Sequence, residues 1–323
     1  MSLDEEIHEL IAHEGNPPVD SAPEVRRALS AAIAKLTQEN IPSSRATSRY
    51  IESLNNEGLV QFEAPLLSTT QVEEVREFLL QEPVFNAHVP AQSDGKKRYL
   101  QPKNLLDRFR SNPRKYPFAS YSLSSVVACP HLLEAALSDQ AIQLAHNYLG
   151  CLPTLFSLHS WWTFGGIQST TTHSWHRDPD DYKFCVLFIF LTDVDHTGGQ
   201  HVFVRHSHTR ETMEGRLKSY GGSSDFPWKD HTCHPEEHPF YAAHKLDCVG
   251  QAGTAFFADT YAIHKAIPPK NDRLVAWARY GLHAGRSYVA DKTKPVSWNP
   301  VKGRIKRNEE IEHITRLILS PRI

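Results

Sequence analysis

The stretch that decides the fold runs from Ser174 to His208 and reads SWHRDPDDYKFCVLFIFLTDVDHTGGQHVFVRHSH. An apolar run fills its middle, and Gly198-Gly199 separates this run from a second, shorter one. Apolar runs of this length, bounded by polar and glycine turn signals, are typical of buried β-strands. The stretch therefore predicts strands at Lys183–Leu191 and at His201–Val204.

The same stretch places His176 two residues before Asp178. On a β-strand, residues i and i+2 point to one face, so the imidazole and the carboxylate would project side by side, as a metal chelate needs. The spacing alone is weak, because 19 His and 37 acidic residues in 323 positions give about two such pairs by chance. The other pair, His234 and Glu236, lies in a proline-interrupted loop. A surface histidine beside a solvated acidic turn is the alternative interpretation of His176 and Asp178.

Further segments predict a β-rich domain with helices around it. Short apolar runs between Gly, Pro and Asp turns indicate a β-sandwich or jelly roll. These additional strands are expected at Thr154–Phe164, Cys248–Phe257 and Leu274–Tyr280. Helices are expected at Asp4–His13, from Ser21 onward, after Ser68, at Pro130–Leu149 and at Glu309–Leu319. We expect residues 1–48 to form an N-terminal helical extension, and residues 49–323 to form the main domain with a loop insertion at about 209–247.

Composition excludes several functional classes. The net charge of −2 gives no general attraction to nucleic acid, and no apolar run is long enough for a membrane span. The first residues are acidic and lack the apolar core of a signal peptide. The five cysteines show no tight pairing, which favours buried free thiols in a cytoplasmic protein. We therefore expect a small-molecule substrate, while the oligomeric state is not indicated.

Two other segments have alternative interpretations. The basic run Lys96–Lys115 is either a solvated surface or an electropositive rim that attracts an anionic substrate. The loop Gly221–Lys245 carries four histidines and Cys233. Because its spacings fit no zinc-finger pattern, a lid or surface insertion is favoured over a zinc site.

Downstream, a glycine turn and an apolar strand lead to His264, and nine residues later Arg273 opens another strand. Arg273, Val275, Trp277 and Arg279 share one face of this strand by alternation. A face that carries valine and tryptophan is expected to be buried. An arginine there needs an anionic partner, because an unpaired buried charge is very unfavourable.

His176, Asp178 and His264 together form a two-histidine, one-carboxylate set. Such a set binds one face of a metal, leaves positions open and suits non-haem Fe(II) oxygenases. A 2-oxo acid can fill two open positions, and O₂ the last. The distal carboxylate of 2-oxoglutarate is then the anion for Arg273, whose planar guanidinium binds a carboxylate in two places.

These motifs resemble the phytanoyl-CoA dioxygenase family of Fe(II)/2-oxoglutarate-dependent oxygenases. The resemblance covers about Glu57 to Gly285. It rests on Glu-Gly-Leu-Val at 57–60, Trp-His-Arg-Asp at 175–178 and the glycine-led strand at 198–208, followed by His264, Arg273 and Tyr280.

The resemblance implies a mainly β fold with flanking helices and a double-stranded β-helix (jelly-roll, cupin-like) core. It implies a dioxygenase, an oxidoreductase that hydroxylates or otherwise oxidises an unactivated C–H bond of a small polar or anionic metabolite. The cofactors would be Fe(II), 2-oxoglutarate and O₂, with succinate and CO₂ as products. The residues it implies are His176, Asp178 and His264 for the metal, Arg273 and Phe188 for 2-oxoglutarate, and Arg279 and Trp175 beside the metal ligands or the substrate.

The sequence departs from the family pattern at two places. Arg205-His206 stands where relatives usually have Pro-Gly, and the interval from His264 to Arg273 is slightly short, which leaves Arg279 as the alternative residue for 2-oxoglutarate. Asp178 is present rather than alanine or glycine, so the halide-binding variant of the family is not implied. Two other functions stay open at this point. They are a non-catalytic jelly-roll binding protein and a zinc hydrolase that uses the same ligands.

Overall fold

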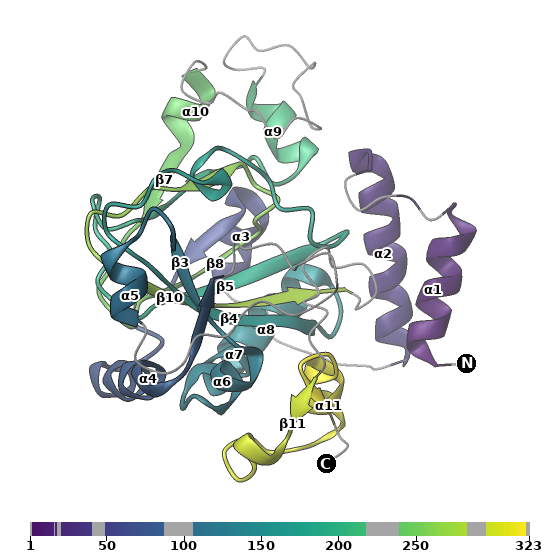
Figure 1. Cartoon of the computed structure of the whole chain (residues 1–323). Coiled ribbons are helices and arrows are strands. Elements are labelled where there is room, and N and C mark those ends of the chain that lie inside the picture. The colour runs from purple at the N-terminus through teal and green to yellow at the C-terminus, as the bar shows by residue number, and fades with distance from the viewer. Residues whose placement is uncertain are drawn as a thin grey trace.

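The computed structural model describes residues 2–15, 17, 21–40, 49–86, 106–217, 239–282 and 295–320. Residues 96–105 of the basic run and 221–238 of the histidine-rich loop lie outside the described residues. The interpretations of those two segments therefore stay predictions. Figure 1 shows the arrangement of the described elements.

The core of the molecule is an antiparallel sheet of seven strands in the order β1-β8-β5-β10-β4-β3-β2. The strands predicted at Thr154–Phe164, Lys183–Leu191 and Leu274–Tyr280 are all central members of it, as β4, β5 and β10. The strands in this order are Leu59–Gln61, Ala255–Ala258, Phe184–Phe190, Arg273–Gly281, Thr154–Thr163, Phe118–Tyr121 and Val84–Asn86.

A smaller sheet of three antiparallel strands has the order β7 (Lys245–Cys248), β6 (His201–Val204) and β9 (His264–Ala266). Phe203 of β6 joins a buried apolar cluster with Phe188 and Phe256 of the larger sheet. The two sheets therefore pack face to face, with aromatic side chains between them. We call the side of the larger sheet that carries Phe188 and Phe256 its inner face.

The outer face of the larger sheet carries the alternate residues of each strand. Leu187, Ile189 and Leu274 belong to a second core, which also contains Ile142 and Ala145 of helix α8 (Asp139–Leu149). The period-2 pattern of the strands thus separates two apolar layers. The helices of the main part are α3 (Arg49–Glu57), α4 (Thr69–Gln81), α5 (Leu106–Ser111), α6 (Leu123–Ala128), α7 (Leu132–Ala136), α8 and α11 (Glu309–Thr315).

The two N-terminal helices, α1 (Leu3–His13) and α2 (Pro23–Asn40), lie side by side at one flank of the molecule (Figure 1). A capping box begins α1, in which Ser2 accepts from the backbone of Glu5 and Glu5 accepts from Ser2. Both helices contribute to the same buried core as the outer face of the sheet. The predicted helices are confirmed, and they pack on the main part.

One predicted helix is in fact two. The pattern at Pro130–Leu149 predicted a continuous helix, but α7 ends at Ala136 and α8 begins at Asp139. Ser138 lies between them, and its hydroxyl accepts from the backbone N–H of Ala141 as an N-cap. The apolar spacing continued across the break, so periodicity alone did not reveal it.

Two other boundaries also differ from the prediction. The strand predicted at Cys248–Phe257 is the end of β7 in the small sheet and the start of β8 in the large sheet, separated by a turn in which Gly253 has φ +94°. The closing helix predicted to Leu319 ends at Thr315, and Leu319–Ser320 forms β12, which pairs with β11 (Val296–Ser297). The remaining elements are η1 (Thr171–His173), α9 (Arg210–Leu217), α10 (Pro239–His244) and η4 (Asn299–Val301).

Four of the five cysteines lie in the described part of the chain, and all four are buried free thiols, as predicted. Cys233 lies outside it. None of the helices that the structure describes has the length and apolar character needed to cross a membrane.

Replacing Ser138 by alanine should lower the free energy of unfolding by about 1 kcal/mol, because the first turn of α8 loses its cap. Chemical denaturation measures this change. Ser111→Ala is the matched control, since Ser111 is exposed and its hydroxyl donates to Arg108 without capping a helix start. Equal stability of the Ser138→Ala and Ser111→Ala proteins would contradict the capping role.

Candidate metal centre

The segment that carries His176 and Asp178 is bound to the end of the small sheet. His176 and His264 exchange both backbone hydrogen bonds, with N···O distances of 2.9 and 3.0 Å. The backbone N–H of Asp178 donates to the carbonyl of Thr260 at 2.9 Å. The segment lies outside the regular strands and pairs with His264 through a single-residue bridge. Its i and i+2 side chains still project together, as predicted.

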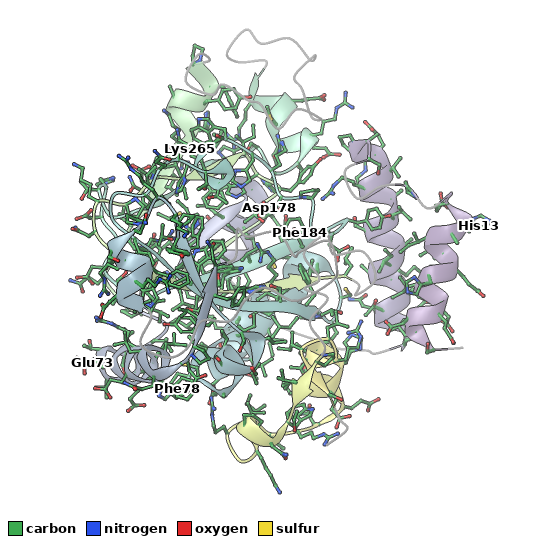
Figure 2. The ribbon with its side chains drawn as sticks, in the orientation of Figure 1. His13, Glu73, Phe78, Asp178, Phe184 and Lys265 are labelled. Atoms are coloured by element: carbon green, nitrogen blue, oxygen red, sulfur yellow. The ribbon has the colours of Figure 1, made fainter. Side chains whose placement is uncertain are left out.

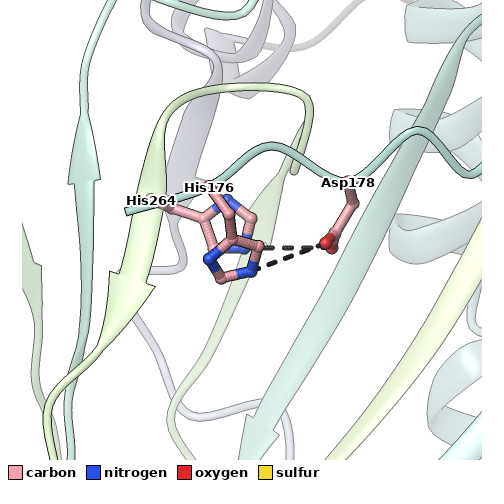
Figure 3. Close-up of side chains that lie close together, drawn as sticks. All are labelled: His176, Asp178 and His264. Atoms are coloured by element: carbon pink, nitrogen blue, oxygen red, sulfur yellow. Dashed lines mark ion pairs between the residues drawn. The ribbon is translucent and has the colours of Figure 1, made fainter. Parts of the chain in front are cut away.

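The three side chains converge on one point (Figure 3). His176 Nε2 lies 3.6 Å from Asp178 Oδ1, and His264 Nε2 lies 3.8 Å from Asp178 Oδ2. All three ligand atoms lie within 4.8 Å of one another. Metal–ligand bonds to imidazole and carboxylate are about 2.0–2.2 Å, so two atoms on one ion lie at most about 4.4 Å apart. The set needs only a small contraction to hold a metal ion.

The tautomers of both imidazoles are fixed by hydrogen bonds to the backbone. Nδ1 of His176 donates to the carbonyl of Ser174 at 2.8 Å, and Nδ1 of His264 donates to the carbonyl of Ala262 at 2.9 Å. With Nδ1 protonated, the lone pair of each neutral ring lies on Nε2, the atom that faces Asp178. Metal-ligating histidines are typically oriented by such bonds to the second ring nitrogen.

The charges of the group also suit a divalent cation. Burial and the neighbouring His176 lower the pKa of His264 to about 4, so its imidazole is neutral at pH 7. Burial alone raises the pKa of Asp178, but His264, His176 and Arg279 outweigh it, and the net shift is downward. Figure 2 shows Asp178 in the middle of the molecule, whereas His13 and Glu73 lie at its edges. Asp178 therefore supplies a carboxylate charge to the group, and His264 supplies a neutral nitrogen donor.

Arg273 opens β10 on the inner face and is only 3% exposed. Its Nη2 lies 3.0 Å from Nδ1 of His201, and its Nε has no hydrogen-bond partner in the described ranges. Burial lowers the pKa of Arg273 to about 10, so it is still a cation at neutral pH. In the described part of the chain no carboxylate forms an ion pair with it. A buried cation without an anion is costly, and this points to an anionic ligand.

His201 is a site residue that the sequence reasoning missed. It lies on β6, and burial together with Arg273 lowers the pKa of its imidazole well below the ordinary value. The neutral ring can therefore accept a hydrogen bond from Arg273. Phe188 lies beside it, with ring centroids 4.7 Å apart, so the structure brings Phe188, His201 and Arg273 together. The inward alternation of β6, in which His201 and Phe203 share a face, was the available signal.

Arg279 lies on the same face of β10 but already has a carboxylate partner. Its Nε is 2.8 Å from Oδ2 of Asp180, and both side chains are largely buried. Burial is the main cause that raises the pKa of Asp180, to about 7, while Arg279 opposes this rise. Arg279 therefore does not need an anionic ligand to balance its charge, whereas Arg273, which has no carboxylate partner among the described residues, does. This favours Arg273 as the residue that binds one.

Trp175 has a different environment from the other predicted site residues. Its ring packs in a separate apolar cluster with Val204 and Phe240, and the ammonium group of Lys265 lies 4.4 Å above it. The structure therefore places Trp175 under α10, so Trp175 adjoins His176 in sequence but packs with different neighbours.

Another buried arginine, Arg177, stabilises the loops that carry His176 and His264. Arg177 donates to the carbonyl of Ser207 at 2.6 Å and also to the carbonyl of Tyr261. The guanidinium of Arg26 from α2 lies 3.9 Å from the centre of the Tyr261 ring. The N-terminal helices are thus connected to the loop that leads into His264. These contacts join residues far apart in the chain, so no local pattern of the sequence predicts them.

No family model and no curated protein matches this chain. Among solved structures, it is similar to the non-heme alpha ketoglutarate dependent epimerase SnoN from nogalamycin biosynthesis, at 16% identity over 72% of this chain and 81% of that one, with a TM-score of 0.47. The carbocyclase SnoK from the same biosynthesis has 15% identity over 76% and 85%, with a TM-score of 0.46. HygX from Streptomyces hygroscopicus, crystallised with nickel, 2-oxoglutarate and hygromycin B, has 13% identity over 73% and 87%, also with a TM-score of 0.46. Similarity this low assigns no chemistry, which must come from the residues of this chain.

Replacing Asp178 by alanine should weaken Fe(II) binding at least about 100-fold, because the only charged donor of the group is lost. Anaerobic equilibrium dialysis with metal analysis measures this change. Asp107→Ala is the control, since the Asp107 side chain is 88% exposed and distant in sequence from the group. Retained iron binding by the Asp178→Ala protein would exclude the assignment of this centre.

Proposed function

We propose that this protein is an Fe(II)- and 2-oxoglutarate-dependent dioxygenase similar to the phytanoyl-CoA dioxygenase family. It would convert a substrate R–H, O₂ and 2-oxoglutarate into R–OH, succinate and CO₂. One combined observation supports this proposal most strongly. A group of two Nε2 atoms and one carboxylate that could hold a metal lies in the same interior as a buried arginine that has no anionic partner among the described residues.

The residues fit iron and 2-oxoglutarate together. His176, Asp178 and His264 would hold the metal, whose bound form supplies the redox chemistry. 2-Oxoglutarate needs a cation for its distal carboxylate, and Arg273 is a buried cation without an anionic partner among the described residues. The alternative of a zinc hydrolase uses the same three ligands but gives no role to Arg273. A non-catalytic binding protein gives no reason for two imidazoles oriented to expose Nε2.

The chain's own residues would orient the cosubstrate and exclude water from it. Arg273 would bind the distal carboxylate with the donors that His201 does not occupy. Phe188 would form an apolar wall beside it, since its ring packs on His201 and Phe256. Arg279, which is ion-paired with Asp180, would stay beside the metal ligands rather than bind 2-oxoglutarate.

The fold and the domain division are consistent with this proposal. Two facing antiparallel sheets with the metal group at the end of the small one support a double-stranded β-helix core. We propose residues 1–48 as a helical extension and 49–323 as the catalytic domain. The insertion at 209–247 would begin with α9 and end at β7. The buried free thiols among the described cysteines support a cytoplasmic location.

The proposal is tested by incubating the Fe(II)-loaded protein with 2-oxoglutarate, O₂ and candidate substrates, and measuring succinate. The wild-type protein should release succinate, and the Asp178→Ala protein should not. Hydrolysis of a substrate by the zinc-loaded protein, with no succinate from the iron-loaded protein, would favour the alternative.

Replacing Arg273 by leucine should weaken 2-oxoglutarate binding by roughly 3–5 kcal/mol, because one partner of a buried ion pair is removed. Anaerobic calorimetry on the metal-loaded protein measures this loss. Pyruvate, a 2-oxo acid without a distal carboxylate, should bind both proteins equally and is the matched ligand control. If Arg273→Leu has no effect while Arg279→Leu abolishes binding, the role belongs to Arg279.

Replacing His201 by alanine should weaken 2-oxoglutarate by about 1.5–3 kcal/mol, because a hydrogen bond to a charged group that orients Arg273 is lost. The same calorimetry measures it. His201→Asn, which keeps an acceptor oxygen, should recover part of the loss. In the Arg273→Leu protein, the alanine change should add little. An equal loss in both backgrounds, or an equal loss of pyruvate binding, would show that His201 acts only on the fold.

A further inference from the structure

The inner face of the larger sheet is closed on one side and partly open on the other. On β5 and β8, Phe188, Phe190 and Phe256 are buried beneath the small sheet. On β4, His159 and Trp161 are only half-buried, although they pair with Trp277 and Val275 and share the inner face. Large aromatic side chains that face the interior yet retain exposure mark an opening.

Four aromatic residues around this opening form a row across the sheet, in which each ring contacts the next. We call them the aromatic wall, and they are Phe118, Trp161, Trp277 and His159. Their ring centroids are 4.7 Å apart for Phe118 and Trp161, and 4.5 Å for Trp161 and Trp277. His159 lies 5.3 Å from Trp277. The wall is therefore continuous from β3 across β4 to β10.

The aromatic wall extends between two residues that adjoin the metal centre. At one end, the ring of His173, three residues before His176, stacks on Phe118 at 6.3 Å. At the other end, the guanidinium of Arg279 lies 5.7 Å from the centre of Trp277. Arg279 also acts electrostatically on Asp178. The side chains of His176 and Asp178 keep 22% and 24% exposure, so the wall and the partly open ligands belong to the same region.

The charge and shape of the aromatic wall restrict what it can bind. The described cation that contacts its rings, Arg279, is already ion-paired with Asp180, so the wall itself presents no unpaired cation from the described residues to an ionic group. The indole planes of Trp161 and Trp277 are inclined by 68°, and those of Phe118 and Trp161 by 39°. Inclined rings form a corner, which a puckered ring with C–H bonds on both faces fills better than a flat ring.

The wall also contains a polar atom in need of a partner. Trp277 is 6% exposed, and its indole Nε1 has no hydrogen-bond partner among the residues that the structure describes. A buried N–H without an acceptor is unfavourable, so a bound oxygen atom would relieve it. An uncharged ring that carries oxygen atoms meets the requirements of charge, shape and hydrogen bonding together.

We propose that the aromatic wall binds the saturated, uncharged, oxygen-bearing ring of a substrate, such as the pyranose ring of a glycoside or a hydroxylated carbocycle. The C–H faces of the ring contact the two indoles, and an oxygen accepts from Trp277. This inference rests on the proposed function in one respect, which is that a C–H bond of the bound ring is presented to the metal centre. It narrows the substrate from the polar or anionic metabolite expected from the sequence to a neutral ring.

The binding is tested by saturation-transfer NMR on the full-length, metal-free protein, with methyl β-D-glucopyranoside, phenol and sorbitol as probes. The glucoside should bind best, with the strongest transfer at its ring C–H protons. Trp161→Leu should weaken glucoside binding about tenfold, a loss of about 1.4 kcal/mol, and Trp161→Phe should weaken it less. Trp298→Leu is the matched control, because Trp298 is also half-buried but packs near Arg307.

Absence of glucoside binding, tighter binding of phenol, equal binding of sorbitol, or an unchanged affinity in Trp161→Leu would each overturn this inference. Circular dichroism of the Trp161 variants verifies that they fold. Failure of the proposed function has a different signature. Glucoside binding that depends on Trp161, together with a protein that makes no succinate from 2-oxoglutarate, would reject the dioxygenase and keep the ring-binding wall.

Discussion

A pair of backbone hydrogen bonds between His176 and His264 is the constraint on which the rest of the site depends. It connects two segments 88 residues apart and brings their imidazoles to a centroid distance of 4.2 Å. The bridge also aligns the residues that follow. The backbone N–H of Asp178 therefore donates to the carbonyl of Thr260, and the Asp178 carboxylate faces both rings. Arg177 and Tyr261 stabilise the same loops from behind. Metal binding would therefore need little rearrangement, which reduces the entropic cost of forming the centre.

The second organising feature is an uncompensated charge. The interior between the two sheets is mostly aromatic. Within it, Arg279 is paired with Asp180, whereas among the described residues Arg273 contacts the neutral His201 and no carboxylate. Such an arginine does not stabilise the fold, because no ion pair offsets the free energy of desolvating the cation. Retaining it is consistent with ligand binding rather than folding. The same contrast explains why the neutral, aromatic part of the interior lies at Trp277 and the cationic part at Arg273.

Much of this was predictable from sequence where the signal is local. The alternation of β10 placed Arg273, Trp277 and Arg279 on one face, and the apolar run of β5 predicted a central strand. The break at Ser138 was missed because the apolar spacing continues across it, which made the N-cap serine look like part of one helix. His201 and Asp180 were missed for another reason. Their roles come from hydrogen bonds and ion pairs with β10, and contacts between distant segments leave no spacing in the sequence.

The most direct test of the account is the stoichiometry and order of ligand binding, measured by anaerobic equilibrium dialysis of the full-length protein. The account predicts one Fe(II) per chain, and one 2-oxoglutarate per chain that binds tightly only when the metal is present. Tight binding of 2-oxoglutarate without metal, or an iron-loaded protein that binds none, would contradict the placement of metal and cosubstrate in one interior.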